Sequence, residues 1–128
     1  MVDLQPVFAT ARSLAADAVT TSGCTVRIFT EVDTVDADTL TEQHQTVTLA
    51  EGPALVRDAA GIAAALPGLT VHPGDYVVSM LPSVTTPPAG AAVEVVTAVA
   101  GAPAGRLGAV EGAVRDAAGA LLRLLVRP

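Results

Sequence analysis

Four carboxylates stand close together in the first half of the sequence, where they could bind a divalent cation. They are Glu31, Asp33, Asp36 and Asp38. Carboxylates at alternate positions are ligands of an EF-hand calcium loop, which also needs a glycine in mid-loop and a glutamate at its end. No glycine follows Asp38 at the required place. The pattern therefore favours an acidic, solvated loop, and the sequence predicts no metal site.

The side chains that could act as a nucleophile, a base or a zinc ligand are Cys24, His44, His72 and Ser79. A cysteine nucleophile needs a nearby base, and a structural zinc site needs closely spaced cysteines and histidines. Cys24 stands on the apolar side of a predicted strand, so we interpret it as a small buried hydrophobe. We expect each histidine at the surface or at a strand edge, and Ser79 lies outside a G-x-S-x-G motif.

Aromatic and glycine positions also fail to form a cofactor motif. Tyr76 and Met80 would share one face of a strand with Val78, which indicates core packing. The glycines near the C-terminus do not form G-x-G-x-x-G, and we interpret them as turns and strand ends. They are Gly101, Gly105, Gly108 and Gly112. The sequence therefore predicts that the protein is not an enzyme and has no catalytic residue and no cofactor.

The amino-acid composition excludes further classes of function. The chain has 128 residues, enough for one domain with its own core. About half of it is apolar, yet it has two Phe, one Tyr and no Trp. It has no lysine, which excludes a P-loop and Schiff-base chemistry. Thirteen acidic residues oppose seven scattered arginines, for a net charge of −6, which argues against sequence-specific binding of nucleic acid.

Targeting signals are not recognisable in the sequence. A single cysteine cannot form an intrachain disulfide, which fits a reducing compartment. Asp3 precedes the first arginine and Asp17 interrupts the N-terminal apolar stretch, unlike a signal peptide. The longest weakly polar run, residues 87–106, contains Glu94 and several prolines and glycines, so it is a poor membrane span. We therefore expect a soluble intracellular protein without a membrane partner.

Apolar residues at helical spacing predict an amphipathic helix over residues 3–21, with Asp3 as its cap and Gly23 as its stop. Its solvent-exposed face would carry Arg12, Ser13 and Asp17. Its buried face would consist of Leu4, Val7, Phe8, Ala11, Leu14, Ala15 and Ala18.

Beyond Gly23 the apolar period changes to two, which is typical of strands. Residues 24–28 and 46–49, with Val47 and Leu49, are predicted as half-buried strands. Further strands are expected at 55–58, 76–81 and 93–99, and 76–81 has apolar residues on both faces. Residues 31–43 are polar and acidic and predict a long hairpin loop or mobile arm.

Two stretches are ambiguous between helix and strand. Residues 59–66 could form a helix or an irregular excursion. Residues 107–126 contain several glycines, which favours two strands, at 107–114 and 120–126, joined by a turn at 115–119. The expected fold is mainly β with one N-terminal α-helix: a small barrel or sandwich of six to seven short antiparallel strands. It forms a single domain over residues 1–128, with the body at 24–127 and the arm at 31–43.

The order of segments carries a resemblance. After the helix come GCTVRI (Gly23–Ile28), EGPALVR (Glu51–Arg57), GDYVVSMLP (Gly74–Pro82), PAGAAVEV (Pro88–Val95) and a terminal LLRLLV. This order resembles small proteins encoded among the head-completion genes of actinobacterial phages, which are similar to head-to-tail connector proteins of the stopper type.

The resemblance implies a structural virion protein at the head–tail junction, assembled in the host cytoplasm. Such a protein forms a homo-oligomeric ring, expected to be a dodecamer, that closes the portal channel after DNA packaging. Its partners would be portal or adaptor proteins and the tail terminator, and genomic DNA would pass through the ring without sequence-specific binding. An acidic lumen would suit this passage because it repels phosphate.

The arm and the loop at residues 82–92 are then the expected sites of contact between subunits or with the channel. The candidate interface residues are Glu31, Asp33, Asp36, Asp38, Leu40, Pro82, Val84, Pro87 and Pro88. For the arm, the alternative is a solvated loop without a partner. For the protein, the alternatives are a tail terminator or tail-completion protein, or a cytoplasmic small-barrel module that pairs its edge strand with a peptide.

Overall fold

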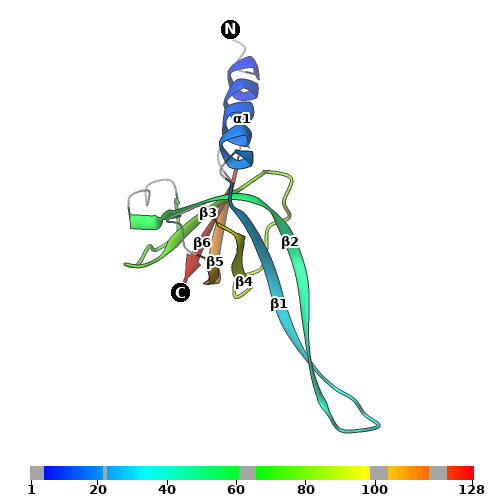
Figure 1. Ribbon diagram of the computed structural model, residues 1–128. Coiled ribbons are helices and arrows are strands. Elements are labelled where there is room, and N and C mark those ends of the chain that lie inside the picture. Colours follow the sequence, from blue (N-terminus) through cyan, green and yellow to red (C-terminus); the bar gives the residue numbers. More distant parts are fainter. Residues whose placement is uncertain (1–4, 22, 61–65, 99–103, 116–120) are drawn as a thin grey trace.

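The computed structural model describes residues 5–21, 23–60, 66–98, 104–115 and 121–128. One helix precedes six antiparallel strands that close into a barrel in the order β1-β2-β3-β6-β5-β4 (Figure 1). The elements are α1 (Gln5–Thr20), β1 (Thr25–Val35), β2 (Glu42–Asp58), β3 (Tyr76–Met80), β4 (Ala92–Thr97), β5 (Gly105–Arg115) and β6 (Leu122–Arg127). The prediction of a mainly β fold with one N-terminal helix is confirmed.

The helix α1 projects away from the barrel instead of packing along it (Figure 1). Its last turn closes with hydroxyl groups, because Thr20 Oγ1 and Thr21 Oγ1 donate to the carbonyls of Ala16 (2.9 Å) and Asp17 (2.6 Å). Gly23 follows with φ 75°, which supplies the predicted stop.

The predicted buried face of α1 is wrong where its side chains are described. Leu14 is 66% exposed and Ala18 is exposed, whereas Val19 is fully buried. The prediction of a helix is correct, but the helix projects away from the barrel, and of its described side chains only Val19 is buried. Ser13 and Asp17 are exposed as expected. The other members of the two predicted faces, and Asp3, lie outside the described side chains: Leu4, Val7, Phe8, Ala11, Arg12 and Ala15.

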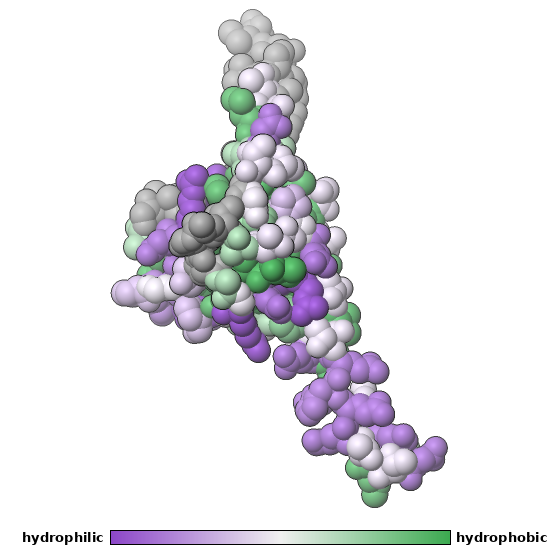
Figure 2. Space-filling model, viewed as in Figure 1, coloured by the Kyte–Doolittle hydropathy of each residue, from purple (hydrophilic) through white to green (hydrophobic). Residues whose placement is uncertain are grey.

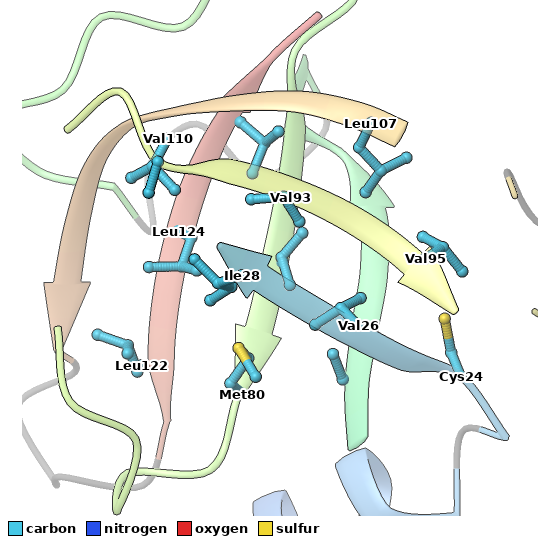
Figure 3. Packing of buried hydrophobic residues seen from close by; sticks show 14 residues of the cluster. Cys24, Val26, Ile28, Met80, Val93, Val95, Leu107, Val110, Leu122 and Leu124 are labelled. Carbon is cyan, nitrogen blue, oxygen red and sulfur yellow. The ribbon is translucent and has the colours of Figure 1, made fainter. Parts of the chain in front are cut away.

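The barrel core is built from apolar side chains, mostly valine and leucine, that point inward from every strand (Figure 3). Val26 and Ile28 of β1 meet Met80, Leu122 and Leu124 across the interior, and all five are fully buried. Tyr76 and Val78 share the inward side of β3 with Met80, so the prediction of core packing at these positions is confirmed. Because no buried member of this cluster is aromatic, the six-stranded ring can close tightly around them.

A second, smaller cluster covers the outside of the barrel over β3 and β6. Val77 and Leu125 point outward there and are buried beneath Ala59 and Leu66, with Leu69 alongside. This cover explains why β3 is buried on both faces, as its sequence predicted. Whether 61–65 is helical lies outside the described residues.

Several predicted boundaries change in the structure. The acidic segment 31–43 is mostly strand, because β1 continues to Val35 and β2 begins at Glu42, and the two pair throughout. Val47 and Leu49 lie in a strand as predicted, but they are 44% and 41% exposed, because this half of β2 extends beyond the barrel. These two strands are therefore long, not short. The predicted strands at 93–99, 107–114 and 120–126 correspond to β4, β5 and β6, and the turn between the last two lies outside the described residues after Arg115.

Candidate functional site

The largest feature outside the barrel is the hairpin formed by residues 30–49, which we call the arm. The pairing of β1 with β4 ends at Phe29, and the pairing of β2 with β3 begins at Ala54. Between these points β1 and β2 pair only with each other, and together they project well beyond the body (Figure 1). Almost every residue from 31 to 49 is exposed.

A tight turn joins the two strands at the tip of the arm. The N–H groups of Leu40 and Asp38 donate to the carbonyl (2.7 Å) and the Oδ1 (2.9 Å) of Asp36, and the Asp36 N–H donates to the carbonyl of Thr41 (3.0 Å). Leu40 has φ 53°, an unusual value for leucine, and its side chain is 79% exposed. Figure 2 shows the arm as mainly hydrophilic, with a hydrophobic spot at its tip.

The two faces of the arm differ in chemistry. Side chains that stand opposite one another in an antiparallel pair lie on the same face, so the register assigns each residue to a face. One face continues the inward-pointing row of β1 and carries no charge: Thr30, Val32, Thr34, Gln43, Gln45 and Val47. The other face continues the outward-pointing row and consists of Glu31, Asp33, Val35, Glu42, His44 and Thr46, of which three are acidic.

The four carboxylates singled out in the sequence do not form one cluster. Glu31 lies near the base of the arm, 3.8 Å from the Arg106 guanidinium. Asp33 pairs across the strands with His44, while Asp36 and Asp38 belong to the tip. Within the described ranges, no group of three or more histidine, cysteine or carboxylate side chains is placed to hold a metal ion.

At the base of the arm, Phe29 lies between two arginines. The guanidinium carbons of Arg27 and Arg106 are 4.8 and 6.0 Å from the centre of its ring. Arg27 also forms a 2.9 Å ion pair with Glu94 of the neighbouring strand. An open cavity of about 360 Å³ lies beside this ring, lined by Phe29, Thr30, Glu31, the segment 88–92 and Arg106. Of the predicted interface residues, Pro88 and Glu31 meet at this cavity.

The loop between β3 and β4 is held by one arginine at the end of β5. The Arg115 guanidinium donates to the carbonyls of Pro82 and Val84, both at 2.7 Å, and contacts the hydroxyl of Thr86 at 3.3 Å. Val84 packs against the barrel core, and Pro87 is buried. These parts of the predicted interface have a role inside the chain, whereas Pro82 and Pro88 remain exposed.

An ion pair between a buried aspartate and a partly exposed arginine ties the C-terminal strand to the loop before β3. Asp75 is 1% exposed and accepts hydrogen bonds from Arg127 of β6, at 3.1 and 3.2 Å, and from the His72 backbone N–H, at 2.8 Å. Arg127 also donates to Thr70 and pairs with Glu111. The hydrogen bond from the Arg127 guanidinium holds the pKa of Asp75 below its usual value against the opposing effect of burial, and the His72 N–H lowers this pKa further.

The candidate reactive side chains lie in unconnected places. Cys24 is buried in the core, and its burial raises the pKa of the thiol, so the prediction of a small buried hydrophobe is confirmed. His44 stands on the arm and His72 in the exposed loop before β3, as expected for surface histidines. Ser79 lies in mid-strand and is 6% exposed.

The predicted role of the glycines is only partly correct. Gly105 begins β5, but Gly108 and Gly112 lie within that strand at its register shifts, not at turns. Gly101 lies outside the described residues.

Sequence reasoning overlooked the arginine contacts, namely Arg27 and Arg106 around Phe29, Arg115 over the β3–β4 loop and Arg127 at Asp75. These contacts join positions far apart in the chain. The local signal was limited to the alternation of Arg27 with buried Val26 and Ile28, which places its side chain outside the barrel.

Comparisons with known proteins return no match: no protein-family model, no curated protein and no solved structure is similar to this chain. Within the described part of the chain, no helix has the length and apolar character needed to cross a bilayer.

Proposed function

We propose that this chain is a non-catalytic structural subunit of a phage head-to-tail connector, a ring-forming stopper that closes the portal channel after DNA packaging and joins the tail. The observation that carries the proposal is the architecture: a small closed barrel from which a long hairpin arm projects on one side and a helix on the other (Figure 1). The order of segments in the sequence, which resembles that of stopper proteins, is the second support.

The distribution of exposed apolar side chains also supports an assembling subunit. Seven large hydrophobic residues are exposed among the described side chains, and five of them lie on the arm, including Leu40 at its tip. The hairpin contributes no side chain to the core cluster of the barrel, so its role does not lie in the packing of that core. An arm of this kind is useful to a protein that has neighbours to contact.

The test is a phage in which an amber mutation stops production of this chain. The expected result, seen by negative-stain microscopy, is tailless heads that leak DNA, and supply of the wild-type chain in trans restores tailed particles. Normal tailed particles in the absence of the chain would contradict the proposal. DNA-filled heads beside aberrant tails would assign the chain to the tail terminator instead. A portal gene a few positions upstream would be a second, independent support.

A small-barrel module that binds a peptide is the second candidate, because β2 leaves an open strand edge between Glu42 and Pro53. Such an edge can accept an extended peptide through backbone hydrogen bonds. A gene far from any phage structural gene, together with a monomeric protein, would favour this function over the connector.

A further inference from the structure

The arm has two open strand edges. Among the described strands, β1 has no neighbour beyond Phe29 except β2, so the other side of Thr30–Val35 pairs with none of them. Before Ala54, β2 likewise has only β1 as a neighbour among these strands, so the other side of Glu42–Pro53 is open as well. The other described strands are paired on both sides within the closed barrel over most of their length, except that β5 pairs only with β6 beyond Val110. Hydrogen-bonding groups for an added strand are therefore concentrated on the arm.

The edge of β2 lacks most of the features by which proteins prevent edge-to-edge pairing. Natural edges are protected by charged side chains, above all lysine, by proline or by a bulge along the exposed strand. The β1 edge carries Glu31 and Asp33, whereas Glu42 is the only carboxylate between residues 42 and 50 of β2. The stretch Gln43–Thr48, QHQTVT, has neither lysine nor proline, and the bulge of β2 lies at the base of the arm, at Leu49, between the pairs Ile28–Ala50 and Phe29–Thr48. Threonine and valine in this stretch favour strand pairing. The edge of β2 is therefore suited to accept another strand.

A second copy of this chain matches the two edges. One arm offers both a β1 edge and a β2 edge, so the β1 edge of one copy can pair with the β2 edge of the next. This head-to-tail pairing leaves the same two edges open at the ends of each row, and repetition of one interface closes a ring when the rotation permits. A foreign peptide would use only one of the two edges and would leave the other unexplained.

The two faces of the arm determine which side chains would lie on each side of the joined sheet. Joined arms that keep their faces aligned would place the uncharged residues on one side of a continuous sheet and the acidic residues on the other. Residues 31–43 hold five of the thirteen acidic residues and no arginine, so the arm carries −5 of the net charge of −6. Neighbouring arms therefore repel one another, and salt should promote their association by screening.

We propose that the arms of neighbouring copies pair edge to edge, β1 of one arm with β2 of the next, and so build an inter-subunit β-sheet with one uncharged and one acidic face. This inference deepens the proposed function and rests on it, since it assigns the contact through which the ring subunits join.

Cysteine cross-linking of the whole protein tests this geometry, because the native Cys24 is buried and each variant then has one accessible thiol. One chain carries Thr34→Cys on the β1 edge. A second chain of different mass carries Gln43→Cys, Gln45→Cys or Val47→Cys on the same face of β2. The two chains are mixed and oxidised at high protein concentration. Because a disulfide forms only when the two Cα atoms lie within about 7 Å, at least one of the three combinations should give a mixed dimer if the arms pair as proposed.

The matched control is the Thr34→Cys chain mixed with a Thr46→Cys chain. Thr46 lies on β2, like Gln43, Gln45 and Val47, but its side chain is on the opposite face of the arm. The yield of this control pair should be several-fold lower, and the yield of the same-face pair should rise several-fold from low salt to about 0.5 M salt. Three results would overturn the proposal. They are equal yields of disulfide for the same-face and opposite-face pairs, homodimers of the Gln45→Cys chain as the main product, and the absence of any cross-link. Cross-links together with a normal phage lacking the chain would overturn only the connector role.

Discussion

Asp75 links the C-terminal strand β6 to the loop that precedes β3. Its carboxylate is 1% exposed and joins Arg127 of β6 to the backbone of the preceding loop. The replacement Asp75→Asn removes the charge that Arg127 faces, so we expect it to lower the free energy of unfolding at pH 7 by about 2 kcal/mol. Urea unfolding measures this change, and Asp38→Asn at the exposed arm tip is the control that should change little.

The same carboxylate predicts a pH dependence. The pKa of Asp75 is lowered in the folded state, so the unfolded chain takes up the proton first as the pH falls. The stabilisation is complete above the unfolded pKa of about 3.9 and is lost as the pH falls through the lower folded pKa. The difference between the wild type and Asp75→Asn should therefore shrink below about pH 4. A difference that stays constant down to pH 2 would show that the charge of Asp75 does not stabilise the fold.

Cys24 gives a second prediction at the scale of one residue. The thiol is 5% exposed and its pKa is raised by burial, so little thiolate is available to react. We expect a thiol reagent at pH 8 to label the native protein many-fold more slowly than the protein in urea. Rapid labelling of the native chain would mean that the end of the barrel near Cys24 opens readily. The replacement Cys24→Ala should leave assembly intact.

At the scale of the element, β5 depends on Gly108. Its φ is 150°, and a Cβ at this position would stand 2.2 Å from the carbonyl oxygen of Arg127 on the neighbouring strand. The backbone of β6 cannot give way without breaking pairs of the barrel. We therefore expect Gly108→Ala to lower the free energy of unfolding by about 3 kcal/mol.

Gly52 in β2 is the matched control for this substitution. It has no neighbour within 4 Å of an added Cβ, and its φ is not positive. Thermal or urea unfolding should show a change within about 0.5 kcal/mol for Gly52→Ala. If both variants unfolded alike, close packing at Gly108 would not be the reason for its glycine.

At the scale of the whole molecule, we expect the barrel to fold without the arm. The core cluster lies entirely outside the arm, and the last pair to keep at its base is Thr30 with Val47. Replacing residues 31–46 by Asn-Gly would leave this pair closed by a two-residue hairpin turn. We expect the shortened protein to stay folded, with a melting temperature within about 5 °C of the wild type, and to lose association between copies. Calorimetry and sedimentation measure the two properties separately.

The same variant also tests whether the negative charge of the arm limits association between copies. Removal of residues 31–46 takes away the five acidic residues of the arm, which leaves the body nearly neutral. If arm repulsion limits assembly, the shortened chain should show no salt-dependent association. Association that persists without the arm would place the contact between copies on the body.

Much of the fold could be predicted because β patterning is local. The alternation of Val26 and Ile28 with Thr25 and Arg27 gave the position, period and inward face of β1 correctly. Tyr76, Val78 and Met80 gave the inward row of β3 in the same way. The stop at Gly23 followed from its freedom to adopt positive φ.

The candidate site was predicted only in part. The acidic segment 31–43 was recognised as a projecting hairpin, but its strand character was not, because threonines and carboxylates carry no apolar alternation. Val47 and Leu49 alternate like a buried strand, yet they are exposed, since burial depends on whether a neighbouring strand or loop covers that face.

The sequence by itself determined the number of strands within one, the helix, the arm and the lack of a catalytic motif, because these features depend on neighbours along the chain. Only the tertiary structure decided that the helix stands clear of the barrel and that four arginines reach partners far away in sequence. It also decided that the arm leaves two strand edges open. Pairing between distant strands determines which backbone groups and which side-chain faces remain free, and a local pattern contains no information about that pairing.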